Sequence, residues 1–145
     1  MTAIRPMRPD DADAMADLTT QLGYSADAAS ISTSMARILA RPGDDALLVA
    51  VDDEDEPIGW IHVARSPALE TSPSATIHGM VVDETRRSAG IGAELLVAAE
   101  VWARAHGARS MTVRSRTERE RAHRFYERHG YAETKRSVVF SRDLA

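Results

Sequence analysis

The sequence predicts an α/β fold organised around residues 75–107. Residues 75–83 are rich in β-branched and apolar side chains, as in a buried strand. From Ile91 onward the apolar residues recur at helical spacing, and Gly107 is placed to end that helix. Since strands and helices alternate in this half of the chain, we expect right-handed crossovers and a locally parallel pair of strands.

The first half of the chain predicts a short strand, two helices and a hairpin. Residues 3–7 form an edge strand, and a helix starts at residues 9–11 and ends at Gly23. A second amphipathic helix runs from about residue 26 to residue 41. The apolar segments 46–51 and 58–63 flank an acidic turn, which we interpret as solvated rather than as a cation site.

Further elements are expected after residue 107. Residues 110–114 form a strand, and residues 118–129 form a last helix ended by Gly130. The alternation of Val138 and Phe140 with Val139 and Ser141 predicts that segments 131–134 and 137–144 complete the sheet. There is no repeat or linker, so residues 1–145 are expected to form a single domain.

The composition excludes several classes of protein. A content of 43% hydrophobic and 28% charged residues is ordinary for a globular chain. The sequence contains no cysteine, which excludes a disulfide, a thiol nucleophile and a cysteine-based metal site. Neither a signal peptide nor a run of membrane-spanning length is present, so we expect a cytoplasmic protein with no membrane partner.

An R-x-x-G-x-G turn joins the central strand to its helix. Gly90 and Gly92 lack a Cβ atom, which allows a close approach of the backbone to a ligand. The free N–H groups and the dipole of the helix N-terminus suit a pyrophosphate, and Arg87 can add a charge-assisted hydrogen bond. A tightly packed loop with a solvated arginine explains the same residues. The chain has neither a P-loop nor a dinucleotide-binding G-x-G-x-x-G.

Two motifs in this order resemble the GCN5-related N-acetyltransferases. The family signature V-x-P-x-x-R-x-x-G-x-G is similar to VDETRRSAGIG at residues 82–92, and A-x-x-F-Y-x-x-x-G-[FY] is similar to AHRFYERHGY at residues 122–131. The resemblance is strongest from Thr76 onward. It implies a mixed, mostly antiparallel sheet of six to seven strands flanked by four helices. It also implies acetyl-CoA as cosubstrate and no metal.

The resemblance implies where acetyl-CoA binds. The strand ending at Met80, Val81 and Val82 would splay from its parallel neighbour and offer backbone groups to the pantetheine arm and the thioester carbonyl. The pyrophosphate would lie against Arg87, Ser88, Ala89, Gly90, Ile91 and Gly92. Ser88 departs from a common family glycine. Arg119 replaces a common asparagine and is expected to reach a phosphate or the ribose of CoA.

The resemblance also implies two catalytic residues. Tyr126 matches the family tyrosine near the sulfur and would be the general acid; the alternative is that Phe125 and Tyr126 are core aromatics of the last helix. His78 would be the general base, since a neutral imidazole suits that role near pH 7. On a regularly alternating strand, His78 shares a face with Thr76, Met80 and Val82. A packed, hydrogen-bonded histidine is the alternative, Glu84 and His62 are other candidates, and some amines need no base.

Eleven basic residues against four acidic ones between residues 104 and 142 indicate an anionic partner, although the net charge of the chain is −4. The phosphates of CoA would satisfy this charge. Nucleic acid is the rival partner, but no nucleic-acid-binding motif is present. Arginines on a solvated helix face, paired with glutamates, are a further explanation. We therefore expect no nucleic-acid partner.

The expected function is direct transfer of an acetyl group from acetyl-CoA to a primary amine of a small molecule. A ternary complex is expected, because no cysteine can carry the acyl group. Residues 98–107 and the C-terminal VFSRDL resemble the aminoglycoside 6'-N-acetyltransferase group, and the loop at residues 23–25 would set acceptor specificity. Two alternatives stay open: acetylation of a protein N-terminus or lysine, and a catalytically silent acyl-CoA-binding regulatory module. A homodimer is a family-level expectation.

Overall fold

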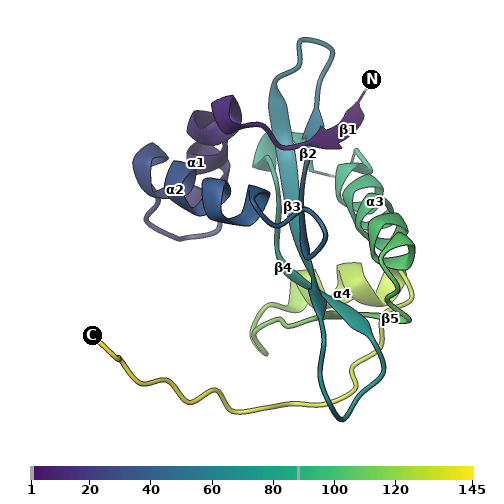
Figure 1. Cartoon of the computed structure of the whole chain (residues 1–145). Coiled ribbons are helices and arrows are strands. Elements are labelled where there is room, and N and C mark those ends of the chain that lie inside the picture. The colour runs from purple at the N-terminus through teal and green to yellow at the C-terminus, as the bar shows by residue number, and fades with distance from the viewer. Residues whose placement is uncertain (1, 88) are drawn as a thin grey trace. The chain divides into compact units, whose positions relative to one another are not determined.

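The computed structural model describes residues 2–87 and 89–145. The chain divides into two compact units, of which the first ends at Arg114 and the second is Ser115–Ala145. The first unit contains a five-stranded sheet with the strand order β1-β2-β3-β4-β5 (Figure 1). The strands are β1 (Ala3–Pro6), β2 (Asp45–Val51), β3 (Pro57–Ser66), β4 (Ser74–Val82) and β5 (Ser110–Val113).

The sheet of the first unit is mixed. Strands β1 to β4 pair antiparallel with their neighbours, and β4 pairs parallel with β5. Helices α1 (Ala12–Thr20) and α2 (Ala28–Leu39) pack on one face, and α3 (Ile91–Ala105) packs on the other (Figure 1). Two short 3₁₀ helices, η1 (Pro9–Asp11) and η2 (Glu84–Arg86), precede α1 and follow β4. The mostly antiparallel sheet and its parallel pair confirm the prediction.

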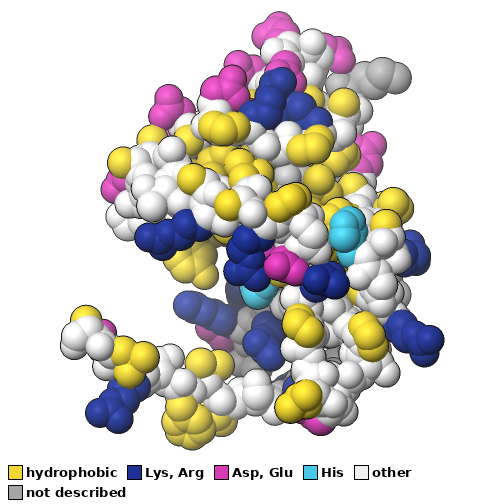
Figure 2. Space-filling model, in the orientation of Figure 1, with side chains coloured by type: hydrophobic (Ala, Val, Ile, Leu, Met, Phe, Trp, Pro, Cys, Tyr) yellow, Lys and Arg dark blue, Asp and Glu magenta, His cyan; other side chains and the backbone are white. Residues whose placement is uncertain are grey.

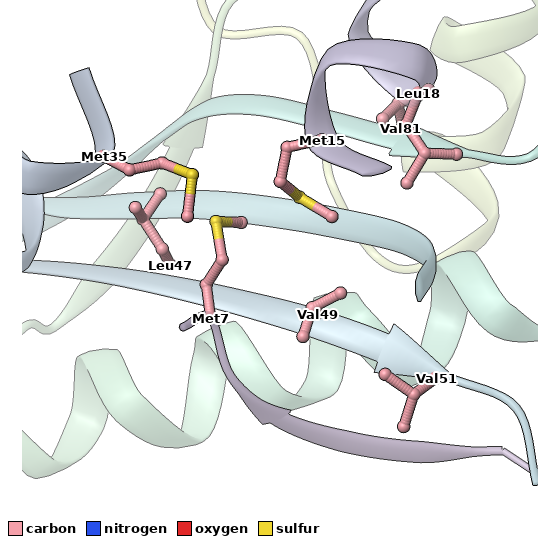
Figure 3. Close-up of a cluster of buried hydrophobic side chains, with 8 residues drawn as sticks. All are labelled: Met7, Met15, Leu18, Met35, Leu47, Val49, Val51 and Val81. Carbon is pink, nitrogen blue, oxygen red and sulfur yellow. The ribbon is translucent and has the colours of Figure 1, made fainter. Parts of the chain in front are cut away.

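Apolar side chains fill both faces of this sheet. On the face of α1 and α2, methionines from the helices and the β1–η1 connection meet branched side chains of the strands (Figure 3). The members of this cluster are Met7, Met15, Leu18, Met35, Leu47, Val49, Val51 and Val81. On the other face, Ile91, Leu95, Ala99 and Ala103 of α3 are buried, as their spacing predicts. The helical spacing of these apolar residues therefore predicts which side of α3 is buried against the sheet.

The hairpin turn between β2 and β3 is acidic and solvated. Its aspartates and glutamates stand out at the end of the first unit where the turn projects (Figure 2). Asp52 accepts hydrogen bonds from the N–H groups of Glu54 and Glu56, at 2.9 and 3.0 Å. These bonds hold the pKa of Asp52 below its usual value. The carboxylate of Asp52 therefore stabilises the turn through hydrogen bonds to its backbone.

The second unit differs from the prediction in one respect. Helix α4 (Glu120–Arg128) forms within the segment where the last helix was expected. However, residues 131–145 form no strand, and the sheet has five strands rather than six to seven. The apolar side chains of this tail are exposed (Figure 2), namely Val138, Val139, Phe140 and Leu144. Alternation marks a segment that can form a strand, but a strand exists only when a neighbour accepts its backbone hydrogen bonds.

The start of α1 is held by an ion pair that the sequence does not reveal. Residues 9–11 were expected to start the helix, and Asp11 is the N-cap residue of α1, but its side chain makes no capping bond to this helix. It instead binds Arg5 in a bidentate pair, at 2.8 and 2.9 Å, and accepts the N–H of Arg8 at 2.7 Å. Arg5 also binds Asp55 of the hairpin turn at 2.9 Å. One arginine therefore joins β1, η1 and the β2–β3 turn.

We expect Asp11→Asn to lower the free energy of unfolding at pH 7 by about 2–3 kcal/mol, because the half-buried guanidinium of Arg5 loses its buried carboxylate partner and keeps only the exposed one. The hydrogen bonds from Arg5 hold the pKa of Asp11 below its ordinary value of 3.8. The unfolded chain therefore binds the proton more readily than the folded one. The stability that Asp11 contributes is present above pH 3.8 and is lost as the pH falls through the lower folded-state pKa.

Asp55→Asn is the matched control for Asp11→Asn. Both substitutions remove a carboxylate from the same arginine, but the side chain of Asp55 is 54% exposed and that of Asp11 only 6%. We expect the control to lower the free energy of unfolding much less than Asp11→Asn does, because water screens an exposed pair. Urea unfolding at pH 7 and pH 3 measures both variants. If the two variants lost the same free energy of unfolding at pH 7, the role assigned to the burial of Asp11 would be contradicted.

Candidate functional site

One edge of β4 becomes free halfway along the strand. On the β3 side, β4 keeps its antiparallel partner as far as Val82, which pairs with Gly59. On the β5 side, the parallel pairing ends where Ile77 meets Val113. The backbone groups of Met80, Val81 and Val82 on that side therefore have no strand partner within the sheet. Backbone N–H and C=O groups need hydrogen-bond partners, so this edge can bind an extended ligand.

The free edge leads into a tightly bonded turn. Asp83 donates its N–H to the carbonyl of Ile58 at 2.8 Å, and its Oδ1 accepts the N–H and the hydroxyl of Thr85 at 2.9 and 2.8 Å. These bonds lower the pKa of Asp83. The N–H of Glu84 is bound by Gln21 Oε1 at 2.9 Å, beside the C-terminal end of α1. Gln21 carries no motif, so the sequence offered no signal for this contact.

Gly90 begins α3 in a conformation that favours glycine. It is the N-cap residue, with φ 81° and ψ 6°, in the left-handed region. Hydrogen bonding within the helix starts with the N–H of Glu94, which binds the carbonyl of Gly90 at 3.1 Å. The N–H groups of residues 91–93 precede this bond and are therefore not used by the helix. Free N–H groups and the helix dipole at this terminus are the features on which the expected pyrophosphate site depends.

The other residues that were predicted to bind the pyrophosphate differ in exposure. Arg87, Ala89 and Gly90 are exposed, which leaves the turn open to a ligand. Ile91 is buried and anchors the first turn of α3 in the core, while its N–H remains at the helix start. Gly92 is half-buried. Ser88 lies outside the residues that the structure describes.

A β-bulge sets the direction of His78. His62 of β3 pairs with Gly79, and Val63 pairs with Ile77, so His78 is an extra residue on β4. A Cβ atom on Gly79 would lie 2.8 Å from the ring of Trp60, two residues before His62 on the same face of β3. His78 and Gly79 therefore both point to the face of α1 and α2.

This bulge corrects the expected strand pattern. Met80 pairs with Ile61, whose side chain lies on the opposite face from His62. His78, by contrast, lies beside His62, with the two ring centroids 4.9 Å apart. The expectation that His78 shares a face with Met80 and Val82 is therefore wrong, because that expectation assumed unbroken alternation. Val81 is the residue after the bulge that points to the same side as His78.

The surroundings of His78 favour its neutral form. The residue remains accessible, as a proton acceptor must be. Partial burial of its ring lowers the pKa of His78 below the ordinary 6.5, and the charges of His62 and Arg114 act in the same direction. The carboxylate of Asp45 acts against them. A neutral imidazole at pH 7 can accept a proton.

Tyr126 and Arg119 lie in the second unit. Tyr126 is a half-buried residue of α4, and its ring meets those of Phe125 and Tyr131 edge-on, with centroids 5.2 and 5.7 Å apart. Burial raises the pKa of the Tyr126 phenol above its ordinary 10.0, so the hydroxyl keeps its proton at neutral pH. The charge of Arg119, which precedes α4, acts in the opposite direction. The phenol can thus donate a proton.

The model of the Acetyltransferase (GNAT) family matches residues 13–131 of this sequence. The chain belongs to this family. Its membership confirms the predicted enzyme class, an N-acetyltransferase of the small-molecule type. A GNAT acetyltransferase needs a place for an acyl donor. The Gly90 turn lies within residues 82–92, the segment that resembles the family signature, and the free edge of β4 leads into it.

Curated and solved relatives agree with this assignment. The chain is 31% identical to Aminoglycoside N(6')-acetyltransferase type 1 of Stenotrophomonas maltophilia, over 97% of this chain and 93% of that protein. The fold matches aminoglycoside antibiotic 6'-N-acetyltransferase AAC(6')-IG from Acinetobacter haemolyticus with a TM-score of 0.84, at 24% identity and 99% coverage of both chains. AAC(6')-Iy, solved with the bisubstrate analog CoA-S-monomethyl-acetylneamine, gives a TM-score of 0.87 at 20% identity and 99% coverage of both chains.

Neither a metal-binding cluster nor a membrane-spanning helix is found in the described part of this GNAT chain. No group of three or more histidine, aspartate or glutamate side chains is placed to hold a metal ion there. None of the helices described is long and apolar enough to cross a membrane.

Proposed function

We propose that this GNAT enzyme transfers an acetyl group from acetyl-CoA to a primary amine of a small molecule. The observation that carries the proposal is the continuity of the site. The free edge of β4 runs through the η2 turn to the left-handed Gly90 and the open N–H groups of α3. A row of backbone partners that ends in an anion site suits an extended arm with a pyrophosphate at its end. The aminoglycoside-acetylating relative supports a small-molecule amine as acceptor.

We assign the steps of the reaction to residues of this chain. Acetyl-CoA supplies an activated thioester, and the N–H groups at Met80 to Val82 bind its arm and its carbonyl oxygen. His78 takes the proton that the amine nitrogen loses as the new N–C bond forms. Tyr126 donates its proton to the sulfur as the C–S bond breaks. The sequence contains no cysteine to carry the acyl group, so the proposed transfer is direct.

The remaining site residues belong to the same proposal. Arg87 and Arg119 would bind phosphate groups of CoA, since a guanidinium forms strong charge-assisted hydrogen bonds with phosphate. Ser88, Ala89 and Gly92 would complete the turn around the pyrophosphate. We further propose that the two units work as one N-acetyltransferase domain of residues 1–145, because the family match at residues 13–131 spans both of them.

A homodimer is also part of the proposal. Val138, Val139, Phe140 and Leu144 are 77–91% exposed, which leaves an unusual amount of apolar surface on one short tail. A second copy that covers these side chains would remove them from water. Light scattering after size-exclusion chromatography should show twice the monomer mass. A monomer at every protein concentration would rule out the homodimer. A cytoplasmic location and the absence of nucleic-acid and membrane partners stay predictions from the sequence.

An acceptor screen tests the proposed function directly. The purified protein is mixed with acetyl-CoA and four acceptor classes: aminoglycosides, the same compounds with their amines blocked, polyamines, and peptides with a free N-terminus or lysine. Thiol release and the mass of the product report transfer. We expect acetylation of small-molecule amines, lost when the amine is blocked. Acetylation of peptides alone would favour a protein acetyltransferase, and acetyl-CoA binding without transfer to any acceptor would indicate a regulatory module.

A further inference from the structure

Three polar side chains form a line across three adjacent strands of the sheet. They are Asp45 on β2, His62 on β3 and His78 on β4. The three residues lie on the face covered by α1 and α2. Asp45 and His62 belong to no sequence motif, and the function proposed above uses only His78.

The strand register explains why these residues meet. Leu47 is directly opposite His62, and Asp45 precedes Leu47 by two residues on the same face of β2. Asp45 and His62 are therefore diagonal neighbours, within reach of polar side chains. Oδ1 of Asp45 lies 2.9 Å from Nε2 of His62. The bulge on β4 then places the ring of His78 beside that of His62, with centroids 4.9 Å apart.

The contact between Asp45 and His62 determines the orientation of the His62 ring. The side chains of Asp45 and His62 are only 8% and 18% exposed, so each needs a partner in place of water. An ionised carboxylate can only accept a hydrogen bond, which means that Nε2 of His62 donates it. Arg41 lies 3.4 Å from the other oxygen of Asp45 and holds the carboxylate from the opposite side.

We propose that Asp45 and His62 are positioning residues for His78. Asp45 fixes the tautomer and the plane of the His62 ring, and His62 holds the imidazole of His78 at the bulge. The charge of His62 also disfavours a proton on His78, because like charges at this distance repel each other. Of the two histidines, His78 is the exposed one, so it is the one that an acceptor amine can reach. This role rests on the proposed function of His78 as the base.

Three charged groups from other parts of the sheet act on His78. They are His62 on β3, Asp45 on β2 and Arg114, the residue that follows β5. The charges of His62 and Arg114 disfavour a proton on His78, and that of Asp45 favours one. Removal of His62 therefore takes away a charge that keeps His78 neutral. In a His62→Gln protein, His78 should gain its proton at a higher pH than in the wild-type protein.

Two measurements on the whole protein test the proposal. The first is the titration of the histidines followed by NMR. The His78 signal should titrate at a higher pH in His62→Gln than in the wild-type protein. The second is the pH profile of kcat/KM, whose acidic limb should also move to higher pH. We expect a loss of about three- to tenfold at pH 6 and a value within about twofold of wild type at pH 8.5. An equal loss at every pH would indicate packing alone and would overturn the proposal.

Two further variants complete this test. Asp45→Asn should release the His62 ring from its single tautomer, which the ¹⁵N shifts of the ring report even if the variant is less stable. His106→Gln on α3 is the matched control and should leave the acidic limb unchanged. If His62→Gln still transferred acetyl groups but its His78 titrated at the same pH as in the wild-type protein, the proposal would be overturned. If no amine were acetylated, the proposed function would fail, and the NMR titration would still decide whether the histidines are coupled.

Discussion

Replacement of Tyr126 by phenylalanine should lower kcat by roughly 100-fold, the effect expected when a general acid is lost. The substitution removes only the hydroxyl, so the ring keeps its edge-on contacts with Phe125 and Tyr131. Burial raises the pKa of the phenol above 10.0, and the wild-type enzyme therefore holds this proton throughout the range from pH 6 to about pH 9. The loss should be the same at each pH in this range.

Tyr131→Phe is the matched control for Tyr126→Phe. It deletes the same hydroxyl from the neighbouring ring, at a position where the family motif accepts either phenylalanine or tyrosine. Steady-state kinetics with saturating acetyl-CoA and the best acceptor of the screen measure both proteins. We expect full activity in the control and unchanged CoA binding in both. Unchanged acetylation by Tyr126→Phe at every pH would rule out the acid role and leave Tyr126 as a core aromatic.

Substitution of Gly90 by glutamate should abolish the thermal stabilisation of the protein by acetyl-CoA. A carboxylate would stand at the helix N-terminus where the structure offers N–H groups to an anion, and it would repel phosphate groups. A ligand raises the melting temperature in proportion to ln(1 + [L]/Kd), so a 100-fold weaker Kd removes up to about 2.7 kcal/mol of stabilisation. Acetyl-CoA and desulfo-CoA should shift the wild-type protein, and ATP should not.

Two control substitutions separate backbone strain from loss of the anion site. Gly107→Glu, at the other end of α3, also places glutamate at a left-handed position, with φ 89°. It should lower the melting temperature of the free protein and preserve the shift with acetyl-CoA. Gly90→Ala adds strain of about 1–2 kcal/mol without charge and should retain part of that shift. If Gly90→Glu responded to acetyl-CoA as fully as Gly107→Glu, the assignment of this turn to CoA would fail.

The elements of the first unit could be predicted because their signals are local. Ile91, Leu95 and Ala99 recur at the helical period, and all three are buried where α3 meets the sheet. The left-handed Gly90 could likewise be predicted, since a glycine between a strand and a helix start has few other reasons to be there. These properties depend on neighbours within one or two turns of the chain.

The surroundings of His78 depend on contacts between residues that are distant in sequence. No periodicity of β4 indicates the bulge at His78, because the bulge is defined by the pairing of Ile77 and Gly79 with residues of β3. The contact between Asp45 and His62 joins residues 17 apart in sequence, and the sequence analysis assigned no role to Asp45. The bidentate pair of Arg5 and Asp11 was missed for a similar reason, since Asp11 reads as a helix cap in the sequence alone.

By itself, the sequence determined the family, the enzyme class and the order of the helices and strands as far as α4. The tertiary structure alone decided which way His78 points, where β4 loses its β5 partner, and that the tail around Phe140 forms no strand in this chain. The physical reason is the same in each case. Helices and turns satisfy their hydrogen bonds between residues close in sequence, whereas a strand depends on a neighbour whose register the local sequence does not specify.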